Sequence, residues 1–341
     1  PRRRKAGRMS GQRILRVLDP GLLSTVQDLG RTGAGAMGVS PSGAADRFSA
    51  RAANRLASNA DGAALIETTM SGASFEVGAP CLVALTGARA HLAIDGRSRS
   101  AWRSWPVGAG SRVVVGPAED GLRSYLAVGG GVVVPLVMGS ASTDVGAGFG
   151  GRVLTIGDEL ELGSSESLRA MAYPRDAVPS LRSPFVLRAM VGPDAARVGD
   201  ACVAALLDRT YRASACSSRQ GLRLEGEPLD VAGASGAVSA GVCAGCVQVA
   251  GDGLPIVMLA EHQTTGGYPV ALCLITADIA LAAQVRPGDI VRFERVNRGA
   301  AREALEASSA RLRAMRPVAV DGGGTAGDDR LARGFFEGVT S

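Results

Sequence analysis

Short apolar segments follow one another along most of the chain, and most are bounded by glycine, proline or aspartate. This pattern is typical of short β-strands joined by tight turns. In the first half it predicts strands at residues 14–18, 75–77, 82–86, 91–94, 112–115 and 124–128, and strands resume at residues 185–190. The hydrophobic pattern therefore predicts a mainly β protein.

Three segments instead carry the spacing of an amphipathic helix. Residues 44–56 place Phe48, Ala52 and Leu56 on one face, and Ser42 stands where an N-cap is expected. A second helix is predicted at residues 196–207 and a third at residues 300–315. The fold should therefore contain only a few short helices.

The length of the chain favours two domains. A single core stops growing near about 250–300 residues, and this chain has 341. Residues 164–184 are polar and punctuated by proline, which predicts a linker between a first domain at residues 13–163 and a second at 185–296. We expect residues 1–12 to be a basic disordered arm and residues 297–341 to be a helical and flexible tail.

The net charge of +5 comes from the N-terminal end of the chain. Residues 1–16 hold seven of the 37 cations and no acid, which leaves 30 cations against 32 acids in the remainder. A nucleic-acid-binding protein carries its basic residues on a folded face. No nucleic-acid partner is therefore expected.

Residue types that many enzymes require are scarce. Lys5 is the only lysine, so the folded part cannot supply the lysine of a phosphate-binding loop, a Schiff base or a biotin carrier. Among six cysteines only Cys243 and Cys246 have paired spacing, which we interpret as two small residues beside a turn. We expect no metal site, no membrane segment and a cytoplasmic protein with reduced cysteines.

A dense polar insert, Glu261 to Pro269, interrupts two apolar runs between Gly253 and Val285. Gln263, Thr264 and Thr265 offer side-chain donors to a polarised carbonyl, and Gly266 lets backbone N–H groups approach a ligand. The alternative is a tight hairpin whose hydroxyls satisfy the local backbone. We favour catalytic roles for Gln263 and Thr264 and binding roles for Thr265 and Gly266.

Two further side chains of this insert are candidates. His262 is the only histidine within a polar cluster, and a catalytic role is as well supported as a structural one. Tyr268 adds a phenol for substrate binding. We therefore include both residues in the predicted site.

A second polar cluster, residues 217–224, contains two arginines. Arg219 and Arg223 could each hold a substrate carboxylate through a bidentate pair. The alternation of residues 222–225 predicts a strand that separates the two, so Arg219, in the turn, is favoured. For Arg223 a salt bridge is an equally good interpretation.

A third cluster, residues 24–31 and 38–46, supplies the remaining candidates. Asp28 and Asp46 are the candidate acids or bases, and Asp28 is favoured. The alternative for Asp28 is an ion pair with Arg31, and the alternative for Asp46 is to complement the dipole of the following helix. Arg31, Ser40 and Ser42 are candidate substrate-binding residues. A serine-hydrolase site is rejected, because the sequence shows no histidine-containing triad.

Six motifs give the chain a resemblance to a known family. PGLLSTVQDLGR, GVSPSGAAD, LTGA, YLAVGGG, SRQGLRLEG and QTTGGYP occur in this order over about residues 13–295. They resemble the biotin-dependent carboxyltransferase family that includes the KipA-like proteins, which are also described as the C subunit of 5-oxoprolinase or as allophanate hydrolase subunit 2. The resemblance implies two cyclophilin-like β-barrel domains.

The resemblance also implies a function. It implies a subunit that is inactive alone. Together with a KipI-like subunit and a LamB/YcsF-like subunit, it would hydrolyse 5-oxoproline to glutamate. ATP and Mg²⁺ would be bound through the complex. Two alternatives are the carboxyltransferase component of a urea-carboxylase-like enzyme, with biotin on another chain, and a non-catalytic antagonist of a KipI-like inhibitor. Family members often carry Asp or Asn at the position of Ser218, and Glu at the position of Ala240. Both differences remove polar groups near the predicted site, so a different amide substrate is also possible.

Overall fold

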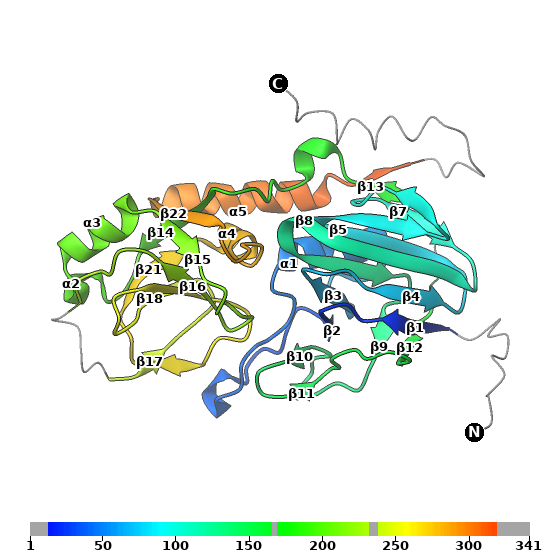
Figure 1. Cartoon of the computed structure of the whole chain (residues 1–341), viewed down its shortest axis with the longest axis horizontal. Coiled ribbons are helices and arrows are strands. Elements are labelled where there is room, and N and C mark those ends of the chain that lie inside the picture. The colour runs from blue at the N-terminus through cyan, green and yellow to red at the C-terminus, as the bar shows by residue number, and fades with distance from the viewer. Residues whose placement is uncertain (1–12, 166–168, 232–237, 319–341) are drawn as a thin grey trace.

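A computed structural model describes residues 13–165, 169–231 and 238–318 of the chain. The predicted arm at residues 1–12 and the tail beyond residue 318 lie outside the described residues. Two β-rich units lie side by side, and one long helix crosses both (Figure 1).

The first unit is a ten-stranded sheet around one aliphatic core. Its main path runs β2 (Leu23–Gln27), β3 (Leu65–Thr69), β8 (Ser111–Val128), β4 (Ser74–Val77), β1 (Ile14–Asp19), β12 (Glu159–Leu162) and β9 (Val132–Val133). Off this path, β5 (Cys81–Ile94) pairs with β8, β6 (Arg97–Arg99) and β7 (Ser104–Val107).

Two long strands replace four short predicted ones. Residues 82–86 and 91–94 belong to the single strand β5, and residues 112–115 and 124–128 belong to β8. Gly87 explains why the interruption does not end β5. Its φ is +86°, and a Cβ there would clash with the carbonyl oxygen of Arg123. The glycine therefore marks an irregularity inside a continuous strand, where the register with β8 shifts.

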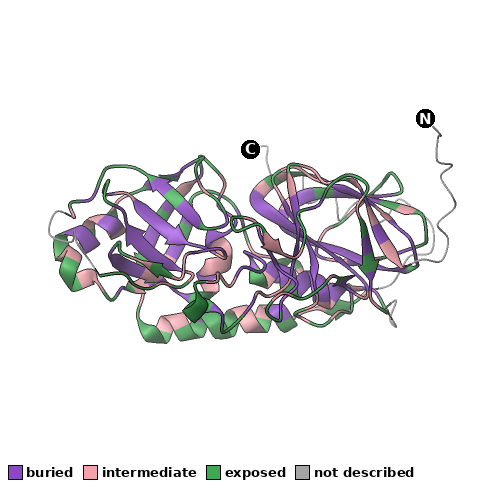
Figure 2. Cartoon of the chain, turned by 90° about the horizontal axis from the view of Figure 1, so that it is seen from below, coloured by how far each residue is buried: buried purple, intermediate pink, exposed green. Residues whose placement is uncertain are grey.

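The second unit is a closed barrel of seven strands. In order these are β14 (Phe185–Val191), β21 (Val270–Leu274), β18 (Cys246–Val249), β19 (Pro255–Met258), β16 (Gly221–Glu225), β15 (Tyr211–Ala213) and β22 (Ile290–Arg295). Parallel pairing of β14 with β22 closes the barrel. The strands of both units are mostly buried (Figure 2). The prediction of a mainly β protein with two barrel domains and a few short helices is confirmed.

Two helix predictions need correction. Helix α1 (Arg47–Leu56) is capped by Asp46, whose Oδ1 accepts from the N–H of Ser49 at 2.9 Å. Ser42 lies further upstream with φ +50° and does not cap the helix. The helix predicted at residues 196–207 is two helices, α2 (Ala195–Val198) and α3 (Asp200–Asp208), because Gly199 takes φ +85° between them.

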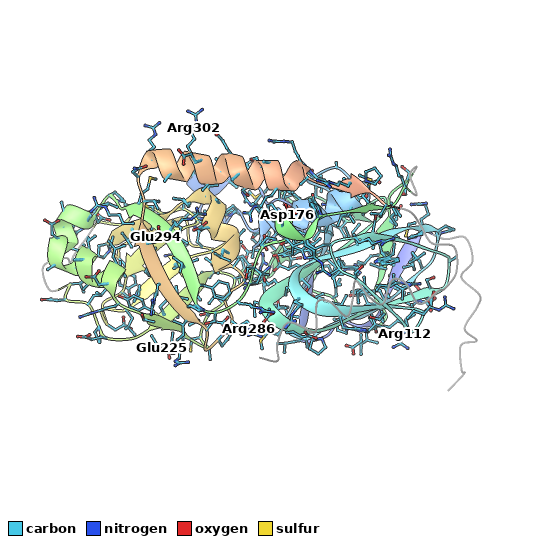
Figure 3. All side chains as sticks on the ribbon, turned by 90° about the horizontal axis from the view of Figure 1, so that it is seen from above. Arg112, Asp176, Glu225, Arg286, Glu294 and Arg302 are labelled. Carbon is cyan, nitrogen blue, oxygen red and sulfur yellow. The ribbon has the colours of Figure 1, made fainter. Side chains whose placement is uncertain are left out.

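Helix α5 (Arg298–Arg313) packs against both units through α1 and α4 (Thr276–Ala282). Near its end the carbonyl of Leu312 accepts from Arg55 Nη1 at 3.0 Å and from Tyr173 Oη at 2.8 Å. Arg302 projects from its outer side (Figure 3). Among the described residues, no helix is both long enough and apolar enough to span a membrane.

The remaining elements are short. They are η1 (Gly35–Met37), η2 (Arg175–Ala177), and three two-residue strand pairs: β10 (Thr143–Asp144) with β11 (Phe149–Gly150), β13 (Met171–Ala172) with β23 (Arg316–Pro317), and β17 (Ala240–Gly241) with β20 (Thr265–Gly266). The segment that joins β10 to β11 reaches the second unit, where the N–H groups of Val145 and Gly146 donate to Glu261.

Candidate functional site

A cavity of about 730 Å³ lies between the two barrels. The first barrel and its loops contribute, among others, Ser40, Thr69, Arg123, Asp144 and Phe149. The second contributes, among others, Ser218, Arg219, Gln220, Glu261, His262 and Gln263. A ligand in this cavity would therefore be held by residues from both domains.

Four buried charges meet at the seam between the barrels, and three of them, Arg123, Arg219 and Glu261, also line the cavity. Arg219, in the turn before β16, donates through Nε to Glu261 Oε1 at 2.5 Å and through Nη1 to Glu67 Oε1 on β3. Arg123 on β8 lies beside the same carboxylate, with Nε 3.6 Å from Glu67 Oε1. Each of these side chains is at most 5% exposed. We call Glu67, Arg123, Arg219 and Glu261 the charge cluster.

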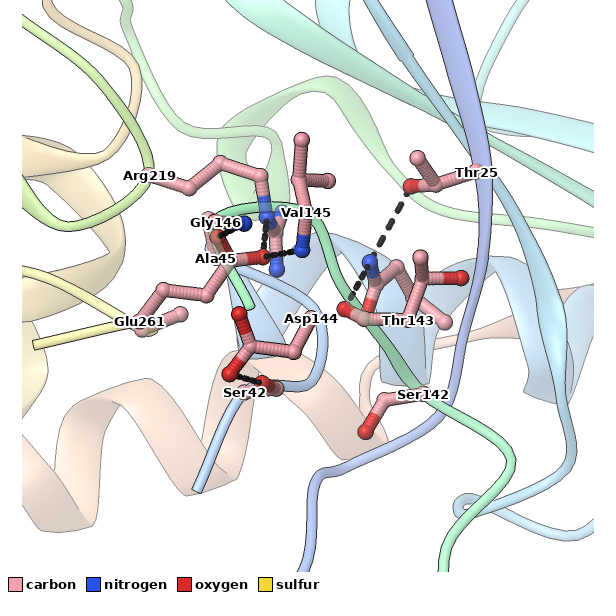
Figure 4. A network of polar contacts seen from close by, with 12 residues as sticks. Thr25, Ser42, Ala45, Ser142, Thr143, Asp144, Val145, Gly146, Arg219 and Glu261 are labelled. Carbon is pink, nitrogen blue, oxygen red and sulfur yellow. Dashed lines mark hydrogen bonds and ion pairs between the residues drawn. The ribbon is translucent and has the colours of Figure 1, made fainter. Parts of the chain in front are cut away.

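Backbone groups of the first domain complete the coordination of the charge cluster. Glu261 accepts from the N–H groups of Val145 and Gly146 at 3.1 and 3.3 Å (Figure 4). Arg219 Nη2 donates to the carbonyl of Gly43 at 2.5 Å. All three guanidinium nitrogens of Arg219 are thus engaged by the protein. The observed role of Arg219 is to join the domains, and its predicted role as a carboxylate clamp stays a prediction.

Within the cluster, Glu67 and Arg219 favour each other's charged form despite their burial. Burial by itself raises the pKa of Glu67, but the charges of Arg219 and Arg123 outweigh it and hold the pKa below its ordinary value. Burial likewise opposes the charge of Arg219, yet Glu67 and Glu261 raise its pKa. Two cations and two anions therefore balance at the seam.

Acid should weaken this seam through Glu67. Because its folded pKa lies below the ordinary 4.5, Glu67 stabilises the fold above that pH, and the stabilisation is lost as pH falls through the folded pKa. We expect Glu67→Gln to lower the free energy of unfolding at neutral pH and the difference from wild type to shrink below about pH 4.5. Urea denaturation of both proteins, from neutral pH to below about pH 4.5, measures this difference in the free energy of unfolding. A difference that grows on acidification would contradict the assignment.

Several predicted site residues line the cavity. Ser40, Arg219, His262 and Gln263 do so. Gln263 Nε2 donates to Gln248 Oε1 at 3.1 Å. His262 Nδ1 lies 2.7 Å from the carbonyl of Gln263, and because a carbonyl only accepts, Nδ1 carries the proton. With the proton on Nδ1, the lone pair of an uncharged ring is on Nε2.

Asp28, Arg31 and Ser42 do not line the cavity but hold the loops behind it. Asp28 accepts from Gly30 N–H, Ser140 Oγ and Ala141 N–H, each at 2.7 Å. Arg31 donates to the carbonyl of Ser142 at 2.5 Å and stacks on Phe149, so the alternative of an Asp28–Arg31 ion pair is wrong. Ser42 donates to Asp144 Oδ2 at 3.1 Å. Catalytic and binding roles for these residues find no support in this geometry.

The remaining predicted residues lie outside the cavity lining. Thr264 and Tyr268 belong to the polar insert, and Thr265 and Gly266 form β20. Arg223 is exposed on β16, as the strand prediction for that segment implied, and is separated from Arg219. Of the polar insert, therefore, only the first residues, Glu261 to Gln263, line the cavity.

Sequence reasoning missed Glu67, Arg123, Asp144 and Gln284. Gln284 accepts from Leu122 and Arg123 N–H at 3.0 and 2.9 Å and donates to Asp46 at 2.8 Å, so it too joins the domains. Only Glu67 could have been found from the sequence, because a charged residue stands out inside the strand-like run of residues 65–69. No group of described residues could hold a metal ion.

The family model for the carboxyltransferase domain, subdomain A and B, matches residues 37–295. The chain therefore belongs to this carboxyltransferase domain family, and the resemblance seen in the motifs is confirmed. It is 37% identical to the C subunit of 5-oxoprolinase of Escherichia coli (strain K12) over 287 residues, which cover 82% of this chain and 90% of that protein.

Two solved structures share the fold. The urea amidolyase of Kluyveromyces lactis matches with a TM-score of 0.82 and 26% identity, over 88% of this chain and 20% of that one. The protein TTHA0988 matches with a TM-score of 0.76 and 32% identity, over 84% of this chain and 56% of that one. The chain thus spans about half or less of either solved protein.

Proposed function

We propose that this chain is one subunit of a multi-chain enzyme that hydrolyses 5-oxoproline to glutamate at the expense of ATP. The observation that carries the proposal is the 37% identity to the C subunit of E. coli 5-oxoprolinase over 90% of that protein. The partners would be a KipI-like subunit and a LamB/YcsF-like subunit. ATP and Mg²⁺ would be bound through the complex, since Lys5 is the only lysine of this chain.

The cavity between the barrels supports an amide substrate. A lactam carbonyl reacts only when donors meet the charge that develops on its oxygen. Gln263 can donate to such an oxygen, while His262 presents an acceptor nitrogen that could take a proton. The charge cluster is internally balanced, so it positions the walls without supplying a free charge.

The test is release of glutamate from 5-oxoproline with ATP and Mg²⁺, by the chain alone and with its two partner subunits. We expect ATP-dependent glutamate only from the mixture. Gln263→Ala should lower the rate by about 10²-fold, the typical cost of removing one donor to a developing oxyanion. Arg223→Ala is the matched control and should keep the wild-type rate, because Arg223 is exposed and away from the cavity.

Two outcomes would contradict this proposal in different ways. A stable complex that releases no glutamate would exclude 5-oxoproline hydrolysis and favour another amide or a purely regulatory subunit that binds a KipI-like inhibitor. Glutamate release that is unchanged in Gln263→Ala would keep the activity and move the site away from this cavity.

The similarity to urea amidolyase favours a second candidate, carboxyl transfer to a urea-like amide. Biotin would then be carried on another chain. ATP-dependent incorporation of labelled bicarbonate into urea, in the presence of a biotinylated partner, would distinguish it from lactam hydrolysis.

A further inference from the structure

Three of the six cysteines converge beside the polar insert. Cys243 lies in the turn before β18, Cys246 is the first residue of β18, and Cys273 faces Cys246 across the antiparallel pair with β21. The sulfurs of Cys243 and Cys246 are 3.5 Å apart. Cys243 is exposed, whereas Cys246 is 6% exposed. We call these three residues the thiol cluster.

The turn geometry brings Cys243 and Cys246 within reach of a covalent bond. The N–H of Cys246 donates to the carbonyl of Cys243 at 3.1 Å, which closes a four-residue turn. Such a turn holds its first and last Cα atoms within about 7 Å, and disulfides span about 4.4–6.8 Å between Cα atoms. Bond formation therefore requires the two sulfurs to approach by about 1.5 Å, to the usual length near 2.05 Å.

The surroundings of the thiol cluster favour a reactive central sulfur. Hydrogen bonds from Cys243 and from Cys273 lower the pKa of Cys246 despite its burial. Because the thiolate is the nucleophile in cysteine oxidation, Cys246 is the sulfur that reacts first. Cys243 is the exposed neighbour that can resolve the oxidised form.

We propose that Cys243 and Cys246 are a peroxide-responsive dithiol that closes to a disulfide. The sulfur of Cys246 attacks one oxygen of hydrogen peroxide, forming an S–O bond and breaking the O–O bond, and water leaves. The sulfur of Cys243 then attacks the sulfenic sulfur, forming the S–S bond and breaking the S–O bond, and a second water leaves with the thiol proton. The dithiol loses two electrons, and the peroxide is reduced to two waters.

Closure of this disulfide would act on the polar insert. Val242, directly before Cys243, donates its N–H to the carbonyl of Thr264 at 3.0 Å. The next pair, β17 with β20, joins Gly241 to Thr265. Movement of Cys243 toward Cys246 is therefore transmitted to the segment that follows Gln263. The thiol chemistry itself does not depend on the proposed function.

The proposal is tested by oxidising the full chain with hydrogen peroxide. Free thiols are counted after denaturation, and the mass of the intact protein is measured. Wild type should fall from six thiols to four and lose about 2 Da, the mass of two hydrogens. Dithiothreitol should restore all six. Cys216→Ser is the matched control, because Cys216 is also exposed but is outside the thiol cluster, and it should lose two thiols as well.

Variants of the thiol cluster decide which pair reacts. Cys243→Ser should not lose 2 Da, and its Cys246 should instead be trapped as a sulfenic acid by dimedone. Cys273→Ser should still form the disulfide. The proposal is overturned if peroxide oxidises only the exposed Cys216 of wild type and leaves the other five thiols free, or if Cys243→Ser forms a disulfide as readily as wild type. Hydrogen exchange of residues 240–243 and 263–267 should differ between the two redox forms, and unchanged exchange would refute transmission to the insert.

Discussion

Replacing Arg219 by alanine is expected to lower the free energy of unfolding by about 3–5 kcal/mol, the cost of breaking a buried ion pair from one side. Arg219 is 5% exposed and is the only member of the charge cluster that contacts both carboxylates. Its loss leaves Glu67 with the more distant Arg123 and Glu261 with backbone N–H groups alone. Urea denaturation followed by circular dichroism measures the effect.

Arg223→Ala is the control for this experiment, since it removes the same side chain from an exposed position four residues along. We expect it to change the stability by no more than about 0.5 kcal/mol. Adding Glu67→Gln to the Arg219→Ala variant should recover part of the loss, because an uncompensated buried charge is removed. Equal stabilities of the Arg219 and Arg223 variants would show that the charge cluster does not hold the barrels together.

Gly150→Ala is expected to destabilise the protein by about 3 kcal/mol, from backbone strain and overpacking together. Gly150 has φ +84°, and a Cβ there would clash with the carbonyl oxygen of Ser142 and lie 2.6 Å from Arg31 Nη2. The substitution would push the β10–β11 hairpin away from Arg31. This hairpin carries Asp144 to Gly146, so the N–H groups that hold Glu261 would move too.

Gly148→Ala isolates the strain from the clash. Gly148 also has a positive φ, +69°, but a Cβ there meets nothing within 4 Å. We expect Gly148→Ala to cost only about 1–2 kcal/mol, the backbone term alone. Thermal unfolding of the two variants side by side is the measurement, and a Gly148 variant as unstable as the Gly150 variant would reject the steric explanation.

The fold was within reach of the sequence because its signals are local. Alternating strands and turn glycines lie within short segments and predicted a mainly β protein. The family motifs are equally local, and the resemblance that they carry implied the two barrels. Local reasoning was wrong where tertiary contacts determine the conformation. At α1 it predicted Ser42 as the cap, whereas Asp46 is the cap, and Tyr125 and Gln284 also hold Asp46 in place. Gly87 likewise reads as a strand end in sequence but lies inside β5.

The candidate site was foreseen only in part, for a physical reason. His262 and Gln263 were recognised because the polar insert is conspicuous among apolar residues. Glu67 is 152 residues from Arg219, and no local pattern predicts that these two side chains meet. Arg219 was noticed for its motif, but its partners, and hence its bridging position, depend on how the barrels dock.

The charge cluster has a consequence for how the barrels find each other. Glu67 and Arg123 come from the first barrel, and Arg219 and Glu261 from the second, so each brings one cation and one anion to the contact. Each pair is therefore neutral before the barrels meet, and the attraction between the two pairs operates chiefly at hydrogen-bond range. Because ions in solution screen chiefly long-range fields, docking of the barrels during folding should be nearly independent of ionic strength.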